Sequence, residues 1–185
     1  MGNEGMFYRA AYRNRLPLSN RLGRTLWQIV WAVFGRTSPA RLFGWRRLLL
    51  RLFGAQLDRT SLVYPSARIW APWNLSMGPY SCLGPYVDCY NVAPVSLGID
   101  VTVSIRTFLC TASHDIRHPE RPLVTGPITI QRGAFVFAEA FIGMNVVVGE
   151  GAVVAARAVV VRNVESQSIV GGNPARVIGR CDLEG

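Results

Sequence analysis

Aliphatic residues recur every six positions through the second half of the chain. Between residues 130 and 165 the first position of six consecutive hexads is aliphatic: Ile130, Val136, Ile142, Val148, Val154 and Val160. The fifth position is small or β-branched: Ala134, Ala140, Val146, Ala152, Ala158 and Val164. Neither the helical period nor the two-residue period of a plain strand fits this spacing. A fixed short repeat predicts a solenoid whose coils have three flat faces and one inward aliphatic column.

Weaker copies of the repeat extend upstream, with aliphatic positions at Val63, Ile69, Leu75, Leu83, Leu97, Val103 and Leu109. One interruption, from Asp115 to about Gly126, contains two X-Pro steps and a Gly-Pro step, so we predict a loop there. We therefore divide the chain into a basic, apolar helical segment (1–58), a solenoid (59–165) and a short C-terminal cap (166–185).

In the N-terminal segment we predict an irregular arm over residues 1–20. Two apolar stretches follow, 22–34 and 41–53, and a turn is predicted between them at 35–39. Each stretch is shorter than the roughly 20 residues that a membrane-spanning helix needs. Trp, Leu and Phe beside Arg are typical of helices that lie in a membrane interface. The alternative is a pair of helices packed against the main domain with Arg toward solvent.

The charge of the chain is concentrated at its start. The net charge is +9, and every basic residue is Arg. Residues 1–60 hold eleven arginines and two acids, whereas residues 61–185 hold nine of each. Because the basicity belongs to the first third alone, it gives no support to nucleic-acid binding by the whole chain. It favours peripheral membrane contact through residues 20–53, since an Arg near anionic headgroups gains about 1 kcal/mol.

The cysteine spacing and the first 20 residues indicate the cellular compartment of the protein. The four cysteines form no C-x-x-C pair and fit neither a zinc ribbon nor a disulfide scaffold. The first 20 residues lack the apolar run of a secretory signal. We expect a cytoplasmic protein with reduced thiols that can contact the inner face of the cytoplasmic membrane.

Three stretches together resemble the hexapeptide-repeat acyltransferases, whose fold is a left-handed parallel β-helix. They are the repeats at 130–165, "TASHD" at 111–115 and "GGNPARVIG" at 171–179. The stretches "LLLRLFGA" (48–55) and "FLCTASHD" (108–115) look like the acetyltransferases of colanic-acid-type exopolysaccharide synthesis. The resemblance implies a homotrimer with active sites in the clefts between β-helices, acetyl-CoA as donor and a hydroxyl as acceptor.

The resemblance also implies catalytic roles. The His of the T-x-x-H pattern is the general base and maps to His114. A hydroxyl is a weak nucleophile at neutral pH, and an imidazole titrates in the range needed to take its proton. No Cys or Ser has the surroundings of an activated nucleophile, so no acyl-enzyme is expected. The amide of Ala138 would face the thioester oxygen. Asp115, Asp88 or a backbone carbonyl could orient the imidazole.

The resemblance also implies contacts to the coenzyme, which we assign to individual positions of this sequence. Ala156 matches a backbone contact to the pantetheine arm, Arg162 a position near the nucleotide, and Arg176 of "NPAR" a position near the phosphates. Arginine grips phosphate oxygens in pairs. Arg157 and Arg180 are further phosphate candidates, with ordinary solvated arginines as the alternative.

The acceptor site is predicted from residues that precede the His loop. Tyr86 takes the place of the Asn or Asp that contacts sugar in galactoside and maltose acetyltransferases, which argues against those free sugars. Asp88, Tyr90 and Asn91 are candidates for holding acceptor hydroxyls, with plain coil corners as the alternative. His118 matches no motif position and is a weaker candidate on the loop.

The resulting hypothesis is an O-acetyltransferase for a saccharide acceptor, such as a lipid-linked exopolysaccharide precursor. One alternative is a CoA-dependent acyltransferase for a soluble small-molecule or natural-product hydroxyl. Another is a non-catalytic β-helix scaffold. No metal is expected, because metal enzymes on the same fold such as the γ-class carbonic anhydrases need three histidines for one zinc, and the chain has two.

Overall fold

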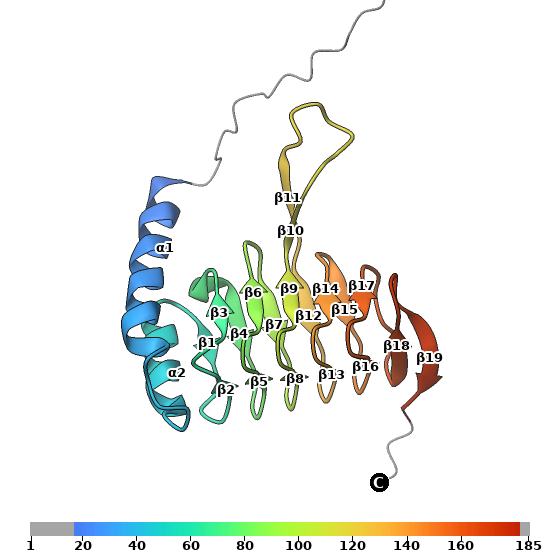
Figure 1. Cartoon of the computed structure of the whole chain (residues 1–185), viewed down its shortest axis with the longest axis horizontal. Helices are drawn as coiled ribbons and strands as arrows, with labels where there is room; N and C mark the ends of the chain where they lie inside the picture. Colours follow the sequence, from blue (N-terminus) through green and yellow to red (C-terminus); the bar gives the residue numbers. More distant parts are fainter. Residues whose placement is uncertain (1–16, 182–185) are drawn as a thin grey trace, which may run out of the picture.

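The computed structural model describes residues 17–181, which form a parallel β-solenoid of about six coils closed at one end by two helices (Figure 1). Five complete coils each contribute one short strand to each of three parallel sheets, and the last, incomplete coil adds β18 to the second sheet. The first sheet holds β1 (Gln56–Leu57), β4 (Leu75–Met77), β7 (Val95–Leu97), β12 (Ile128–Ile130) and β15 (Val146–Val148). The second holds β2 (Leu62–Val63), β5 (Cys82–Leu83), β8 (Thr102–Val103), β13 (Phe135–Val136), β16 (Val153–Val154) and β18 (Ser168–Gly171), with β19 (Arg176–Arg180) added antiparallel at its edge. The third holds β3 (Arg68–Ile69), β6 (Asp88–Tyr90), β9 (Phe108–Cys110), β14 (Phe141–Ile142) and β17 (Val159–Val160).

The aliphatic column predicted from the hexads is confirmed. The first-position residues from Val63 to Val160 are all buried, and so are the fifth-position residues from Ala134 to Val164. Each hexad therefore points two side chains inward, a large one from the strand and a smaller one from the corner. At about 1.5–3 kcal/mol for each buried Val, Leu or Ile, this column is the main source of stability.

Backbone hydrogen bonds join neighbouring coils in both directions. Amides at the strands donate to carbonyls of the next coil, as from Leu62 to Ser81 (2.8 Å) and from Phe135 to Ala152 (2.9 Å), whereas corner amides such as that of Arg157 donate to the preceding coil. The first coil has no coil before it, so carbonyls such as those of Val63 and Ile69 face the N-terminal end without a strand beyond them. An open edge of this kind is a template for pairing with other chains unless it is covered.

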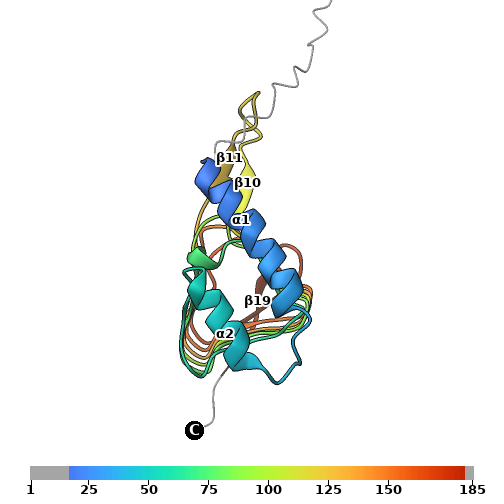
Figure 2. The ribbon, with the colours of Figure 1, turned by 90° about the vertical axis from the view of Figure 1, so that its left-hand side faces the viewer.

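Side chains of the two helices cover that edge. Helix α1 (Leu18–Val30), its π-helical extension (Trp31–Gly35) and α2 (Phe43–Leu52) lie across the end of the solenoid (Figure 2). Six of their side chains donate to first-coil carbonyls: Trp27 Nε1 to Ile69 (2.7 Å), Gln28 Nε2 to Ile69 (3.4 Å), Trp31 Nε1 to Ala67 (2.9 Å), Arg46 Nε to Val63 (2.6 Å), Arg47 Nη1 to Ser61 (2.9 Å), and Arg51 Nε and Nη2 to Leu57 (3.1 and 2.6 Å). Several arginines of the basic segment thus act as internal caps.

Two boundaries differ from those predicted. Helix α1 begins at Leu18, inside the stretch expected to be irregular, and residues 1–16 lie outside the described part of the chain. The coils run from Gln56 to Gly171 and so extend beyond 59–165 at both ends, because β1 pairs with β4 and β18 pairs with β16. No helix between residues 17 and 181 has the length and apolarity needed to cross a bilayer.

The interruption is a β-hairpin arm, whereas a loop from Asp115 was expected. Strands β10 (Ala112–His114) and β11 (Leu123–Thr125) pair antiparallel and project from the coil (Figure 1). The chain leaves the coil at the buried Thr111, whose Oγ1 donates to the Tyr90 carbonyl (2.9 Å) and accepts from the Ala93 amide (3.0 Å). His114 therefore stands on the arm and not on the last turn of the coil.

Candidate active site

His114 is the last residue of β10, opposite Leu123 in the hairpin, and its side chain is exposed. Its Nδ1 lies 2.7 Å from the carbonyl oxygen of Arg121 on the returning chain. A carbonyl oxygen can only accept a hydrogen bond, so Nδ1 must carry the proton. In the neutral ring, Nε2 then holds a lone pair that can accept a proton. The hairpin thus fixes both the ring position and the tautomer.

The acids proposed as orienting partners are engaged elsewhere. Asp115 accepts hydrogen bonds from the backbone amide and Nε of Arg117, both at 3.1 Å, and these bonds hold the pKa of its carboxyl below the usual range. Asp88 lies 3.6 Å from Nη1 of Arg68. Among the three partners considered for His114, the structure brings the backbone carbonyl to the imidazole.

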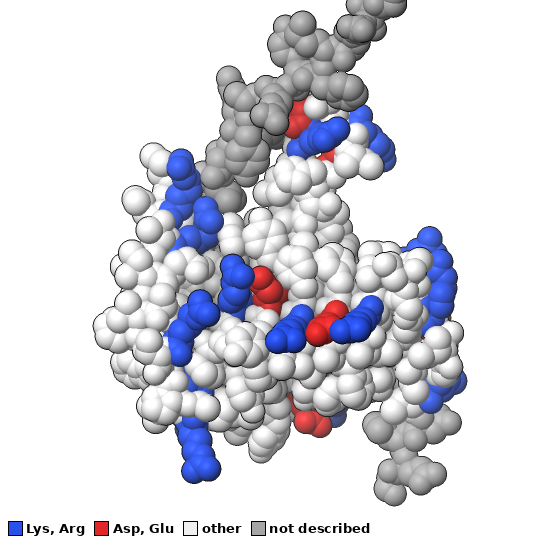
Figure 3. Space-filling view, viewed as in Figure 1, with Lys and Arg blue, Asp and Glu red and all other residues white. Residues whose placement is uncertain are grey.

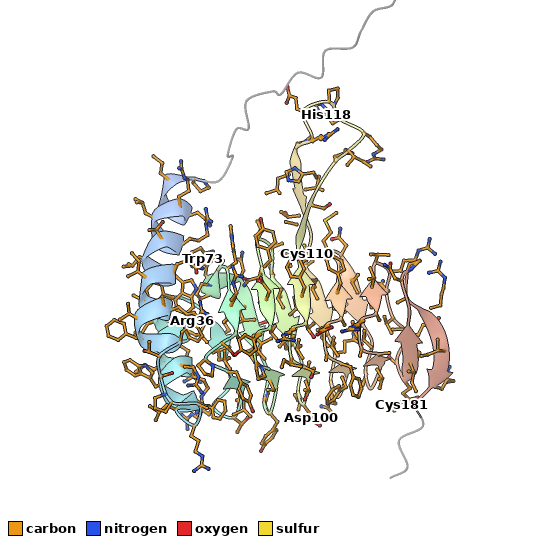
Figure 4. All side chains as sticks on the ribbon, in the orientation of Figure 1. Arg36, Trp73, Asp100, Cys110, His118 and Cys181 are labelled. Carbon is orange, nitrogen blue, oxygen red and sulfur yellow. The ribbon has the colours of Figure 1, made fainter. Side chains whose placement is uncertain are left out.

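His118 lies at the tip of the arm (Figure 4). Its Nδ1 accepts a hydrogen bond from the Glu120 amide (3.2 Å), and its side chain is exposed. His114 thus closes the paired part of the hairpin, and His118 lies beyond it at the tip.

A cavity of about 310 Å³ lies between α1 and the third sheet, lined by Gln28, Arg68, Ile69, Trp70, Asp88, Tyr90 and Phe108. The rings of Trp70 and Tyr90 meet edge to face, with centroids 5.6 Å apart. The Arg24 guanidinium lies over the Trp70 ring, 4.1 Å from its centroid. We call this cavity the aromatic pocket.

Two of the predicted acceptor residues, Asp88 and Tyr90, line the aromatic pocket. The remaining residues that line the pocket were not predicted from the sequence, although a signal for some of them was present. Asp88 pairs in register with Arg68 of the preceding coil and Phe108 of the next coil. A site predicted at Asp88 therefore indicates that these two neighbours line it as well.

Asn91 must be removed from the acceptor candidates. It is fully buried, and its amide group accepts from the Ala71 backbone amide (2.9 Å) and donates to the Ala71 carbonyl (2.6 Å). A side chain that bridges two coils internally is not accessible to a substrate.

A second group of predicted residues lies along the corner between the second and third sheets. Ala138 and Ala156 stack there in successive coils, where the Arg157 amide donates to the Ala138 carbonyl (2.9 Å). The Arg157 Nε is 2.6 Å from Glu139, which holds the pKa of that carboxyl below its usual range. Arg106 approaches the same carboxylate at 3.7 Å. Glu139 therefore offsets much of the charge that Arg157 would offer to a phosphate.

These ion pairs appear as alternating basic and acidic side chains across the face shown in Figure 3. Tyr86 stands at the same corner, exposed, with the Arg106 guanidinium 5.9 Å from its ring centroid. It does not line the aromatic pocket.

The C-terminal end of the solenoid carries a groove of about 240 Å³, which includes Val161, Arg162, Asn163, Ala175 and Arg176 in its lining. Both Arg162 and Arg176 are exposed there. Arg180 lies at the opposite end of β19, across from Ser168, and does not line the groove. Of the four arginines predicted to contact the coenzyme, the structure brings Arg162 and Arg176 together in this groove and leaves Arg157 and Arg180 outside it.

Within one chain, His114 and Ala138 lie on opposite sides of the third sheet. His114 follows the downstream end of the third sheet, beyond β9, whereas Ala138 precedes the upstream end of that sheet, before β14. The width of the sheet lies between them. Across residues 17–181 there is also no cluster of three His, Cys, Asp or Glu side chains that could bind a metal ion.

Comparison with known proteins gives a relative along most of the chain, although no family model matches. The chain is 34% identical to the colanic acid biosynthesis acetyltransferase WcaF of Escherichia coli (strain K12) over 159 residues, which covers 86% of this chain and 87% of the relative.

Solved structures agree in fold. A hexapeptide-repeat acetyltransferase of Vibrio cholerae in complex with acetyl-CoA superposes with a TM-score of 0.81 at 22% identity, covering 92% of this chain and 93% of that one. A maltose O-acetyltransferase from Clostridium difficile gives 0.80 at 19% identity, with 90% of both chains covered. At these identities the structural likeness bears on the fold alone.

Proposed function

The chain belongs to the hexapeptide-repeat acetyltransferases, and from that premise we propose that it moves an acetyl group from acetyl-CoA to a hydroxyl of a saccharide, with His114 as general base. The family membership makes the chain a CoA-dependent acetyltransferase with the left-handed β-helix fold. The acceptor class and the roles of individual residues are the proposal.

The observation that carries the mechanism is the hydrogen bond between Nδ1 of His114 and the Arg121 carbonyl (2.7 Å). It leaves Nε2 of the neutral ring free of a proton, as a general base requires. In the proposed step the acceptor oxygen forms a bond to the thioester carbon while its proton passes to Nε2. The carbon–sulfur bond then breaks, and the imidazolium returns the proton to the leaving thiolate. No covalent enzyme intermediate is needed.

We assign acetyl-CoA to the corner between the second and third sheets and to the groove at the C-terminal end of the solenoid. Arg162 and Arg176 line one groove together with apolar residues, Asn163 and one acid, Glu165. The two guanidiniums are suited to the phosphates of a nucleotide. Ala156 would contact the pantetheine arm, and the Ala138 amide would donate to the oxyanion that forms at the thioester. Arg157 is a weaker candidate because Glu139 pairs with it.

We propose a homotrimer as the active form. The width of the third sheet separates His114 from Ala138 within one chain, so a second chain is needed to bring a base to a donor corner. A cleft between neighbouring β-helices supplies that arrangement, with the arm of one chain facing the corner of the next. This arrangement would also keep water away from the thioester.

The aromatic pocket is the proposed acceptor site. Trp70 and Tyr90 offer apolar ring surfaces, whereas Asp88, Arg68 and Gln28 offer hydrogen-bonding groups. Saccharides present both kinds of surface, and binding sites commonly combine an apolar wall with a few polar groups.

A product assay tests the proposal. The protein is incubated with acetyl-CoA and a panel of saccharides and small-molecule alcohols, and both free thiol and acceptor mass are measured. We expect thiol release coupled to an acetyl ester on a saccharide, with a higher acceptor KM for Asp88→Asn and Trp70→Ala. Turnover on non-saccharide alcohols alone would replace the saccharide with a soluble small-molecule acceptor. A folded, assembled protein that releases no thiol with any acceptor would favour the scaffold alternative.

A further inference from the structure

Helix α1 and its π-helical extension together carry apolar residues on two opposite sides. Trp27 and Trp31 face the solenoid and are buried. A second row on the outer side is more than half exposed at every position: Leu18, Leu22, Leu26, Ile29 and Val33. Their spacing of three or four residues places them on one continuous stripe of the helix. Packing against the solenoid accounts for the first row and leaves the second without a partner in the chain.

Helix α2 extends this apolar surface. Leu48 is about half exposed, and Leu52 is exposed at 72%. Trp45, also exposed, donates from Nε1 to the Phe34 carbonyl (2.9 Å), which fixes it beside the end of the first helical segment. We define the cap patch as Leu18, Leu22, Leu26, Ile29, Val33, Phe34, Trp45, Leu48 and Leu52. Figure 2 shows both helices at the same end of the molecule. Large exposed apolar surfaces of this kind mark interaction sites.

The charge around the cap patch is predominantly positive. Asp58 is the sole acid between residues 17 and 60, against eight arginines. Three of these arginines bond to first-coil carbonyls, and the guanidinium of Arg24 lies over Trp70. Arg21, Arg36, Arg41 and Arg59 are exposed. Basic side chains accordingly appear over the helical end of the molecule in Figure 3.

We propose that the cap patch docks on the surface of an anionic lipid bilayer. The leucines and aromatic rings would enter the boundary between headgroups and acyl chains, and the exposed arginines would contact lipid phosphates. A second copy of the same cap is disfavoured, because it would bring two strongly basic surfaces together. An anionic bilayer complements both the apolar surface and the charge. Docking does not depend on the proposed reaction, but Gln28 of α1 also lines the aromatic pocket, so a docked chain holds that pocket beside the headgroups.

Vesicle co-sedimentation of the full chain tests the proposal. One set of vesicles contains phosphatidylglycerol and phosphatidylcholine in equal parts, and the other contains phosphatidylcholine alone. We expect binding to the anionic set that weakens with added salt. The triple variant Leu22→Gln/Leu26→Gln/Ile29→Gln should bind at least about tenfold more weakly, since three side chains lose apolar burial. Arg36→Gln/Arg41→Gln should lose about fivefold per charge.

Matched controls come from corners of the central coils, outside the cap patch. Ile99→Gln/Ile105→Gln changes exposed apolar residues of the coil corners, and Arg132→Gln changes an exposed arginine of the coil. Both should bind as the parent does. Unchanged helical circular dichroism confirms that the triple variant keeps its fold.

Brominated phosphatidylcholine in the anionic vesicles gives a second measurement that does not depend on the triple variant. It should quench the fluorescence of the parent protein, and Trp45→Phe should lose most of the quenching. The proposal is overturned if the parent protein does not bind anionic vesicles or if the triple variant binds as well as the coil controls. It is likewise overturned if light scattering shows a self-association that the triple variant abolishes while vesicle binding stays absent.

Discussion

The buried guanidinium of Arg46 offers a stringent test of how the helical cap is held. Arg46 is fully buried, and its donors reach the Val63 carbonyl (2.6 Å), the Ser38 hydroxyl (2.9 Å) and the Pro39 carbonyl (2.8 Å), with a further bond to the Ala40 carbonyl. Burial lowers the pKa of this guanidinium, and the neighbouring Arg47 charge adds to that effect. The charged guanidinium of Arg46 is tolerated there because its planar set of N–H donors bonds to several acceptors at once.

Arg46→Met keeps most of the apolar stem and removes every donor. Pro39 and Ala40 are exposed, so water can replace the lost bonds to their carbonyls. Val63 is fully buried, so its carbonyl would be left without a partner, at a cost of about 1–3 kcal/mol. Adding the lost charge-assisted bond to Ser38, we expect a destabilisation of about 3 kcal/mol. Arg36→Met, at an exposed arginine of the same cap, should change stability by less than about 0.5 kcal/mol.

Urea unfolding followed by tryptophan fluorescence measures this effect selectively. All five tryptophans lie between residues 27 and 73, in the cap and the first coils. Repeat proteins are stabilised mainly by contacts between neighbouring coils, so the fluorescence transition should shift further than the far-ultraviolet circular dichroism of the whole solenoid. If the midpoints of Arg46→Met and Arg36→Met coincide, Arg46 does not close the edge of the solenoid as described.

Three further predictions concern the coils and the arm. Gly149→Ala should destabilise the solenoid by about 1–3 kcal/mol in urea unfolding, because its Cβ would lie 2.5 Å from a backbone nitrogen of the next coil, whereas Gly143→Ala meets its nearest atom at 3.4 Å and should be tolerated. Arg157 depresses the pKa of the Glu139 carboxyl, so the stability from this pair is present at neutral pH and lost as pH falls through that lowered pKa; Glu139→Gln should remove this part of the pH dependence of the unfolding midpoint, and an unchanged profile would contradict it. Thr111→Val removes both hydroxyl bonds that anchor the arm, and acetyl transfer should fall by more than thermal stability does, as measured by kcat beside the melting temperature; equal turnover would show that the arm is positioned in another way.

Periodicity was enough to predict the solenoid. A six-residue repeat places the same chemical requirement at the same point of each coil, so a local pattern determines a long-range arrangement. The column from Val63 to Val160 is buried as expected. The ends of the solenoid were less predictable, because β1 and β18 depart from the regular hexads and are recognised by their pairing partners.

The hairpin arm and the cap depend on contacts between residues distant in sequence. Ala112 pairs with Thr125 across a Pro-containing loop, and nothing in the local pattern of either residue distinguishes a hairpin from a loop. Charge counting likewise treats all arginines alike. Only the register of the first coil separates Arg46, which is buried against Val63, from the exposed Arg36.

The candidate site was predictable to the extent that it follows motifs. The T-x-x-H pattern singled out His114, but its partner, the Arg121 carbonyl, is a backbone atom that carries no sequence signature. Asn91 was misjudged because a buried amide that bridges two coils looks, in sequence, like an exposed polar residue. The aromatic pocket needs Gln28 from a helix far upstream, and only the fold brings that residue beside Asp88.

The most direct test of the central claim is the rate of thiol release from acetyl-CoA by His114→Ala, measured with an accepted saccharide and compared with the parent protein and His118→Ala. General-base catalysis by His114 predicts that its removal lowers kcat by about 10²–10⁴-fold while the fold and the assembly stay intact. Loss of His118 should alter the acceptor KM at most. If His114→Ala turns over acetyl-CoA at the rate of the parent protein, the base is another group and the proposed mechanism is wrong.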